Sequence, residues 1–246
     1  HVPGRPLILT HNGDAGRAQV VAAAGAPALA TGSWSVAAAQ GYEDGEALPL
    51  PLLKTIIGRI AATVDLPLSV DFEGGYAADA EGLAANAARI IAVGAVGVNF
   101  EDRRVGGQGL YPVAEQAARI TALRRAAVAA GIPLFINART DLFLEQPDRA
   151  GHAGLIDAAV ERAAAYREAG ADGFFVPALV APDLIGQVCD RAGLPVNVMV
   201  MNDTPPFPDL AGLGVARISH GTRPYRTMAR RLEEDCRAAM AQLPPG

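Results

Sequence analysis

Ser69-Val70-Asp71-Phe72-Glu73-Gly74-Gly75-Tyr76 is the stretch that decides the fold. A short apolar run ends here at two carboxylates, one residue apart, and then at paired glycines. Two later apolar runs end in the same way: residues 96–100 lead into Glu101 and Asp102, and residues 133–136 lead into Asn137, Arg139 and Asp141. The carboxyl ends of the strands in a parallel barrel converge on one mouth, so this pattern predicts that these charges meet there.

Short apolar runs alternate with alanine-rich stretches of helical period from one end of the chain to the other. We predict eight strands, at residues 7–10, 28–31, 68–71, 97–100, 134–138, 173–176, 196–200 and 215–219. Helices are expected between them, chiefly at 16–24, 79–93, 113–130, 155–169 and 182–192, and the glycines expected to end them are Gly25, Gly94, Gly131, Gly170 and Gly193.

Eight such βα repeats predict an α/β protein, a (β/α)8 TIM barrel formed as a single domain by residues 1–246. The rival is an open doubly wound sheet, but no G-x-G-x-x-G motif follows the first predicted strand. Residues 223–243 form a longer, charged helix with alanine and leucine along one stripe. Such a terminal helix is expected to dock on a neighbouring subunit.

Composition excludes several classes of protein. The chain has 246 residues, half of them hydrophobic, and a net charge of -5 without any cluster of basic residues, which argues against nucleic-acid binding. Two cysteines, Cys189 and Cys236, are too few and too far apart for a disulfide framework or a cysteine-rich zinc site. No apolar stretch approaches the roughly 18 residues of a membrane span, and no leader is recognisable, so we expect a cytoplasmic protein without a membrane partner.

The acids at the predicted mouth suggest a metal site. Asp71 and Glu73 alternate, so on a strand both side chains point to the same side, and Glu101 ends the next strand. An oxygen-only set of ligands suits Mg²⁺ or Mn²⁺ rather than zinc. The alternative is a polar loop with solvated acids.

Arg139 places a guanidinium at the same mouth, where it would bind a carboxylate or phosphonate group of a substrate. Its alternative role is an ion pair with Asp141 or Glu101. The Gly32-Ser33-Trp34 segment follows the second predicted strand and offers backbone N–H groups for a second carboxylate. His220 follows the eighth predicted strand, where a histidine that supports other side chains is expected.

The motifs together resemble the isocitrate lyase and phosphoenolpyruvate mutase superfamily over nearly the whole chain. The residues that carry the resemblance are Asn12 to Ala15, Gly41-Tyr42-Glu43-Asp44-Gly45, Val70 to Tyr76, Phe100-Glu101-Asp102, Asn137 to Asp141 and Tyr166 to Asp172. The resemblance implies a (β/α)8 barrel, a Mg²⁺ ion, and a 2-oxo acid or its enolate as ligand. It also implies a homo-oligomer, a dimer or tetramer, whose subunits exchange the last helix.

The resemblance assigns a role to each matching residue. Asp71 matches the direct metal ligand, and Glu73, Glu101 and Asp44 match acids that hold metal-bound waters, with Asp44, Glu101 and Arg139 counted as catalytic. Arg139 matches the arginine that binds the substrate carboxylate. The substrate-binding loop matches Gly32, Ser33 and Trp34, although the usual order there is Ser-Gly, and Asn197 matches a site-facing asparagine on the seventh predicted strand.

Three departures from the family pattern bear on the reaction. The isocitrate lyase branch has Lys-Lys-Cys-Gly-His after Glu-Asp, whereas this chain has Arg103-Arg104-Val105-Gly106-Gly107-Gln108. The asparagine-serine-leucine lid of the mutase branch is also missing. Glu73 replaces the commoner aspartate, and its longer side chain is expected still to reach a metal-bound water.

The sequence therefore predicts a Mg²⁺-dependent carbon–carbon lyase or decarboxylase that acts on a 2-oxo or 2-hydroxy dicarboxylate through an enolate. Loss of CO2 needs no protein acid at the leaving group, which makes the missing cysteine tolerable. Two alternatives remain open at this stage. One is P–C bond chemistry on phosphonopyruvate, as mutase or hydrolase, and the other is a barrel that binds 2-oxo acids without turnover.

Overall fold

The computed structural model of the chain describes residues 1–242. Its strands form one parallel sheet in the order β1-β9-β8-β7-β6-β5-β4-β3-β2. The strands are β1 (Leu7–Leu9), β2 (His11–Asn12), β3 (Leu29–Thr31), β4 (Leu68–Asp71), β5 (Ala95–Glu101), β6 (Phe135–Arg139), β7 (Gly173–Val176), β8 (Val196–Met199) and β9 (Arg217–Ser219). The predicted TIM-like α/β fold is confirmed.

The first predicted strand, residues 7–10, is divided in the structure. β1 pairs with β9 and β2 pairs with β3, and only Thr10 separates them. The segment 7–12 therefore joins the two edges of the sheet and closes the barrel. A break at this point lets one short segment follow two neighbouring strands that diverge as the barrel curves.

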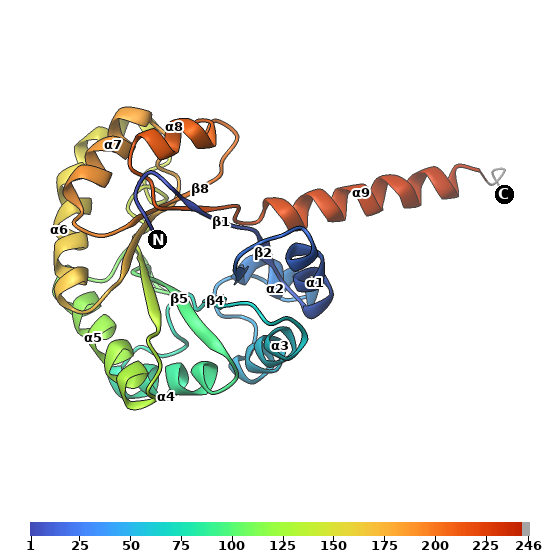
Figure 1. Ribbon diagram of the computed structural model, residues 1–246, viewed down its shortest axis with the longest axis horizontal. Helices are drawn as coiled ribbons and strands as arrows, with labels where there is room; N and C mark the ends of the chain where they lie inside the picture. The colour runs from blue at the N-terminus through green and yellow to red at the C-terminus, as the bar shows by residue number, and fades with distance from the viewer. Residues whose placement is uncertain (243–246) are drawn as a thin grey trace.

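Helices surround the strands in a ring (Figure 1). In chain order, and including α9, which lies outside this ring, the helices are α1 (Ala15–Ala23), α2 (Ser33–Ala39), α3 (Leu50–Thr63), α4 (Ala80–Ile91), α5 (Val113–Ala129), the 3-10 helix η1 (Arg149–Leu155), α6 (Ile156–Glu168), α7 (Pro182–Arg191), α8 (Phe207–Gly212) and α9 (Arg223–Met240). The predicted helices are confirmed, with small differences at their ends. Residue 243 of the predicted terminal helix lies outside the described residues.

The sequence did not predict α2, α3, η1 or α8. α3 buries Leu53, Ile56, Ile57 and Ile60, an amphipathic face that its proline-rich start obscured. The glycines predicted to end helices all have positive φ, from 64° at Gly193 to 110° at Gly94. A Cβ atom at Gly94 would lie 2.6 Å from Cβ of Ala61, so both backbone angle and space require glycine there.

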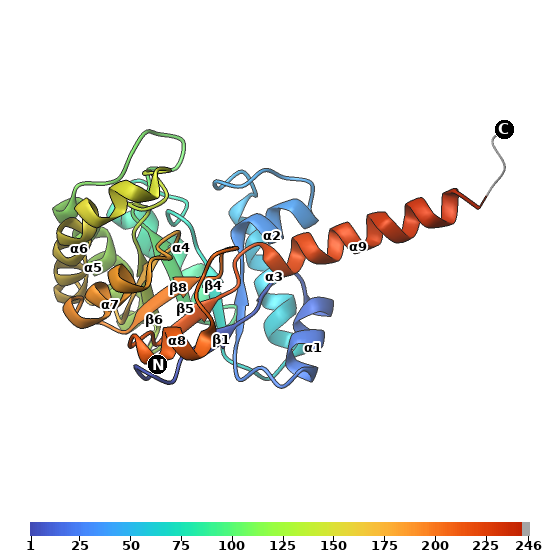
Figure 2. The ribbon, with the colours of Figure 1, turned by 90° about the horizontal axis from the view of Figure 1, so that it is seen from above.

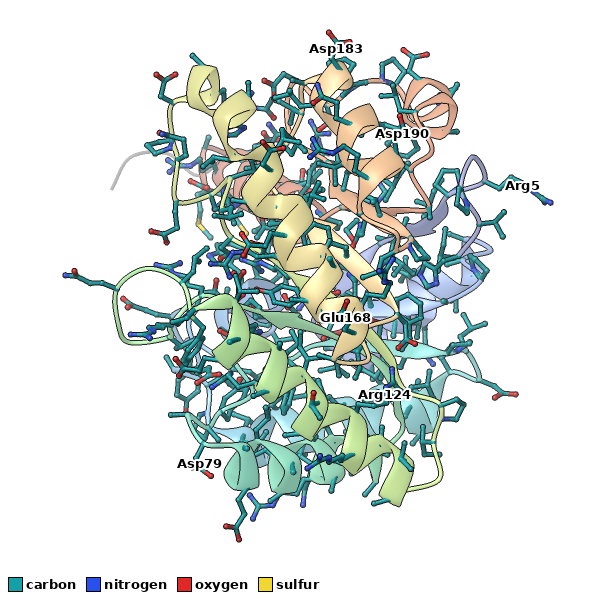
Figure 3. The ribbon with its side chains drawn as sticks, turned by 90° about the vertical axis from the view of Figure 1, so that its left-hand side faces the viewer. Arg5, Asp79, Arg124, Glu168, Asp183 and Asp190 are labelled. Atoms are coloured by element: carbon teal, nitrogen blue, oxygen red, sulfur yellow. The ribbon has the colours of Figure 1, made fainter. Side chains whose placement is uncertain are left out.

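The hydrophobic core lies between the strands and the helices. Val98, Ile136 and Ile218 are fully buried members of it, and they alternate along their strands with residues of the barrel interior. Figure 3 shows α5 and α6 side by side on the outside of the barrel, with Arg124 on α5. The Arg124 guanidinium donates to the carbonyls of Leu134 and Gly170, which fastens α5 to the loops that precede β6 and β7.

The barrel interior is polar. The Asn137 amide donates to Oδ1 of Asn99 at 2.8 Å and to Oδ1 of Asn197 at 3.0 Å. The Ser219 hydroxyl donates to the same oxygen of Asn197 at 3.1 Å, and Nη2 of Arg217 donates to Asn99 at 3.2 Å. These bonds join β5, β6, β8 and β9 across the interior and satisfy side chains that would otherwise be costly to bury.

α9 leaves the barrel and extends away from it (Figures 1 and 2). None of its residues is buried. Its base is anchored, because Tyr225 meets the Trp34 ring edge-on at 5.5 Å and the Arg226 guanidinium lies 4.8 Å from the centre of that ring. No helix within residues 1–242 is long and apolar enough to cross a membrane.

Candidate active site

A cavity of about 350 Å³ lies at the carboxyl ends of the strands. Figure 2 shows two loops, 40–49 in blue and 103–110 in green, that project from this end of the barrel. The predicted site residues that line the cavity are Ser33, Asp44, Glu73, Glu101 and Arg139. The structure thus places Glu101 and Arg139, the last residues of β5 and β6, beside one cavity with Glu73, which follows β4, and Asp44, which lies in the 40–49 loop.

Asp71, the last residue of β4, is held by the segment that follows β3. Its backbone N–H donates to the Thr31 hydroxyl at 2.9 Å, and its Oδ2 accepts from the Ser33 N–H at 3.0 Å. Oδ1 is buried and has no hydrogen-bond partner within the described residues. The Ser33 N–H, which was expected to bind a substrate carboxylate, is therefore already engaged, and one carboxylate oxygen of Asp71 is left for a ligand.

Glu73 lines the cavity from the turn that follows β4, whereas the sequence predicted that it lies on the strand itself. β4 ends at Asp71, and Glu73 has a φ of 51°, so the two acids are not alternating residues of one strand. The Glu73 carboxylate accepts from the backbone N–H of Glu46 at 2.8 Å and from the Tyr76 hydroxyl at 3.2 Å. In return, the Glu46 carboxylate accepts from the N–H of Tyr76 at 2.7 Å.

Glu46 and Tyr76 also have positive φ, 59° and 57°. Left-handed backbone at a non-glycine residue costs on the order of 1–3 kcal/mol and persists where the surroundings enforce it. Here the reciprocal hydrogen bonds between the two loops enforce it, and the 40–49 loop thereby fixes the position of the Glu73 carboxylate. Glu46 lies in a loop without a strand or helix pattern, so nothing in the sequence marked it as part of the site.

Arg139, the last residue of β6, makes both of the ion pairs that were considered for it. Its Nε and Nη2 donate to the two oxygens of Asp141 at 2.6 and 2.9 Å, and its Nη1 lies 3.1 Å from Oε2 of Glu101. The two-pronged edge of the guanidinium is thus turned to Asp141 and not to the cavity. A substrate carboxylate in the cavity would meet the Nη1 end, which also pairs with Glu101.

A buried network behind the site holds this arrangement. The Asp102 carboxylate accepts from the backbone N–H of Asp141 at 2.9 Å, from Nη1 of Arg162 at 3.0 Å and from the Tyr166 hydroxyl at 2.8 Å. Asp102 is completely buried. Sequence reasoning noted Asp102 and Tyr166 only as parts of motifs, because the contact joins residues some sixty positions apart.

The electrostatics of the cluster favour a cation. Burial, together with the charges of Asp71 and Asp44, raises the pKa of Glu73 to about 7. Burial also raises the pKa of Glu101 to about 8, because the neighbouring acids and desolvation outweigh the ion pair with Arg139. The pKa of Asp71 is raised as well, chiefly by burial. One arginine does not balance these carboxylates, and a divalent cation would.

The side chains fit a metal held mainly through water. Within residues 1–242, no three His, Cys, Asp or Glu side chains are grouped closely enough to hold an ion by direct contact. Glu73 and Glu101 line the cavity, whereas Asp71 lies behind its lining and offers one direct ligand through Oδ1, which has no partner within residues 1–242. Mg²⁺ keeps several of its waters and commonly takes only one or two carboxylates, so this donor set suits it.

Some predicted site residues lie elsewhere. The Trp34 ring packs against Tyr225 of α9. Gly32 is the N-cap residue of α2, and its N–H donates to the carbonyl of Asn12. The Asn197 amide is fully buried, and both of its polar atoms bond to protein groups of the barrel interior. Nδ1 of His220 donates to the carbonyl of Leu9 at 3.2 Å, and His220 does not line the cavity that holds the acids.

The 103–109 loop covers one side of the cavity. It is a small hairpin, in which Arg103 and Leu110 form an antiparallel bridge and the N–H of Arg104 donates to the carbonyl of Gly109 at 3.0 Å. Arg103 to Gly107 line the cavity, whereas Gln108 does not. The loop therefore brings two guanidinium groups to the site and no side chain that could serve as a general acid near neutral pH.

Comparison with known proteins agrees with this geometry. A family model described as phosphoenolpyruvate phosphomutase matches residues 1–240. The chain belongs to this family. The resemblance to the isocitrate lyase and phosphoenolpyruvate mutase superfamily, indicated by the motifs, is thereby confirmed. A 2-methylisocitrate lyase from Escherichia coli K12 is 31% identical over 238 residues, which cover 93% of this chain and 78% of the lyase.

Solved structures of other proteins share the fold. A provisionally assigned phosphonomutase from Burkholderia cenocepacia J2315 is 47% identical, with a TM-score of 0.94 over 97% of this chain and 95% of that one. A phosphonopyruvate hydrolase crystallised with oxalate and Mg²⁺ is 23% identical, with a TM-score of 0.78 over 98% of this chain and 88% of that one. Proteins described as a phosphonomutase and as a phosphonopyruvate hydrolase thus share this fold.

Proposed function

We propose that this protein is a Mg²⁺-dependent carbon–carbon lyase or decarboxylase that acts on a 2-oxo or 2-hydroxy dicarboxylate. The observation that carries the proposal is the buried set of acids at the barrel mouth, with an unpartnered carboxylate oxygen on Asp71 beside the cationic Arg139. When bound, Mg²⁺ would supply electrophilic stabilisation of the enolate charge that develops as the bond breaks.

The residues of the chain would hold the ion, orient the substrate and exclude water. Asp71 would hold the ion directly, while Glu73, Glu101 and Asp44 would accept hydrogen bonds from its waters. The Nη1 end of Arg139 would orient the carboxylate next to the reacting carbon. The two arginines of the 103–109 loop would bind the second, distal carboxylate and exclude water from the cavity as they do so.

The proposed reaction follows from what the loop lacks. A carbanion that leaves as a large anionic fragment needs a positioned acid to protonate it, and a missing acid typically costs about 10²–10⁴-fold in rate. Neither arginine of the loop can donate a proton near neutral pH. When CO2 is lost from an oxaloacetate-like acid, the departing CO2 needs no proton, and water can protonate the pyruvate enolate that stays behind. This favours a simple 2-oxo dicarboxylate over isocitrate.

A second candidate is P–C bond chemistry on phosphonopyruvate. It is favoured by the 47% identity to the provisionally assigned phosphonomutase, and by the two loop arginines, since a phosphonate binds guanidinium groups as well as a carboxylate does. The asparagine-containing lid of the mutase branch is absent from this loop, which is why we rank this candidate second.

A Mg²⁺-supplemented assay should compare oxaloacetate, 2-methylisocitrate, isocitrate and phosphonopyruvate. We expect oxaloacetate to be consumed fastest, with pyruvate and oxalate measured separately to distinguish decarboxylation from hydrolytic cleavage. The Asp71→Ala variant corrects for decarboxylation by free Mg²⁺. Phosphorus NMR measures the consumption of phosphonopyruvate. If phosphonopyruvate proves to be the best substrate, the second candidate replaces the first. If none turns over above the variant, the protein is a binding barrel.

A further inference from the structure

Arg217 is a buried cation without an ionic partner, at the end of the barrel opposite the candidate active site. Its side chain is 2% exposed and is among the largest buried side chains of residues 1–242. Of its guanidinium nitrogens, Nη2 donates to the Ser69 hydroxyl at 3.3 Å and to Asn99 at 3.2 Å. Nε is buried with no partner, and no carboxylate of residues 1–242 forms an ion pair with it.

Burying a guanidinium in this way is unfavourable unless an anion compensates it. Burial lowers the pKa of Arg217 to about 10, although the charge of Asp71 acts in the opposite direction and raises it. The Arg217 charge in turn helps to hold His11 in its neutral form, after burial itself, by lowering the pKa of that ring to about 3. The interior around Arg217 is therefore short of negative charge.

A separate cavity of about 170 Å³ reaches this arginine from the amino ends of the strands. Its walls are mostly apolar and include Leu7, Leu9, Leu29 and Phe135, and the polar residues that line it are Ser69, Arg217 and His1. The His1 ring stacks on Phe135, with the ring centres 4.0 Å apart. Leu7, Leu29 and Phe135 are the first residues of β1, β3 and β6, so the cavity lies at the opposite end of the barrel from the acids. Ala28 and the exposed Val96 also line it and are close to solvent.

We propose that this cavity binds a small monocarboxylate, with its carboxylate on the Arg217 guanidinium and its short apolar chain against the leucine and phenylalanine walls. A planar carboxylate matches the free edge of a guanidinium. A single negative charge balances one arginine, whereas a phosphate would bring a second charge and more oxygens than Ser69 and Arg217 can satisfy. The cavity is smaller than the roughly 300 Å³ at which pockets for drug-sized ligands begin, so the ligand is small.

Calorimetry on the full chain in EDTA, with sodium butyrate as the probe and sodium chloride at equal ionic strength as the reference, tests the proposal. We expect saturable butyrate binding to the wild type. Ala28→Phe, which fills the cavity from a half-buried position, should weaken it about tenfold or more. Arg139→Lys serves as a matched control at the other end of the barrel and should leave butyrate affinity unchanged.

Arg217→Met provides an independent arm, because methionine keeps much of the apolar stem and removes the charge. We expect this variant to lose butyrate binding if it folds; if it does not, Ala28→Phe alone decides. The proposal is overturned if butyrate produces no more heat than chloride, since water then solvates Arg217. Equal affinity in Ala28→Phe, or weakening by Arg139→Lys instead, would also overturn it, because the probe would then bind elsewhere.

Discussion

At the scale of single residues, the candidate site is defined by carboxylates that are buried closer together than their charges favour. Glu73 and Glu101 are 6% and 7% exposed, and both face the cavity that Arg139 also lines. Their raised pKa values mean that the folded, metal-free protein binds protons that the unfolded chain releases at lower pH. Because of this difference in bound protons, the free energy of unfolding depends on pH through these two carboxyl groups.

We predict that metal-free protein loses stability as pH rises. The pKa of Glu101 is about 8 and that of Glu73 about 7, against 4.5 without the fold, so the folded state holds the extra protons between about pH 4.5 and 8. The free energy of unfolding therefore falls with rising pH across this window. The melting temperature should drop on the order of 5 °C between pH 5.5 and 8.5.

Glu101→Gln mimics the protonated acid and should flatten this profile, as should added Mg²⁺, which favours the ionised carboxylates. Differential scanning fluorimetry across the pH range provides the measurement. A Glu101→Gln profile with the same slope as the wild type would show that Glu101 does not carry the raised pKa.

Arg139→Lys should keep the fold and weaken substrate binding. A lysine ammonium cannot bond both oxygens of Asp141 and reach Glu101 at the same time, as the guanidinium does at 2.6, 2.9 and 3.1 Å. We expect KM to rise by about tenfold, with a smaller change in melting temperature. Steady-state kinetics and thermal melts check both parts, and an unchanged KM would leave Arg139 with a purely structural role.

At the scale of elements, the strand ends were predictable and the loops were not. The apolar runs that end at Asp71, Glu101 and Arg139 indicated parallel strands and the residues at their mouth. Glu46 could not be found in this way, because its hydrogen bonds with Glu73 and Tyr76 depend on how two distant loops meet. For the same reason, the sequence could not show that Asp141 takes the two-pronged edge of Arg139.

The 103–109 loop gives a prediction of its own. Arg103 and Arg104 line the cavity, and their ion pairs with Glu145 and Glu115 are long, at 3.8 and 3.4 Å, and exposed. Such pairs hold the arginines weakly, so they are available to a substrate. Alanine at both positions should raise KM for a dicarboxylate about tenfold or more. Gln108→Ala, outside the cavity, is the matched control, and an equal KM in the two variants would exclude a substrate role for the arginines.

α9 predicts a homo-oligomer. Met228 and Leu232 are 45% and 63% exposed on a helix that projects from the barrel, and they share a stripe at helical spacing. Exposed apolar stripes of this kind are covered by a partner, and exchange of α9 between subunits to form a dimer or tetramer would cover this one. Leu232→Glu should lower the mass in solution, whereas Glu234→Lys, on the opposite face, should not. A monomeric wild type by light scattering would refute the exchange.

At the scale of the whole molecule, the two ends of the barrel interior carry opposite charges. Acids gather at the carboxyl ends of the strands, and an unpaired arginine lies toward their amino ends, with a network of asparagines between them. The sequence predicted the barrel and its acidic mouth, because both follow from where apolar runs stop. It did not predict the polar interior or the broken first strand, since both depend on contacts across a closed sheet.

We propose that Asp71 carries a Mg²⁺ ion on which a 2-oxo acid is activated. Oxalate resembles the enolate of such an acid in shape and charge, so its binding reports on the assembled site without turnover. Calorimetry should therefore titrate oxalate into the protein with and without Mg²⁺, for the wild type and for Asp71→Ala. We predict binding by the wild type that requires Mg²⁺ and is lost in Asp71→Ala. Oxalate binding of equal strength in EDTA, or in the Asp71→Ala protein, would contradict the claim.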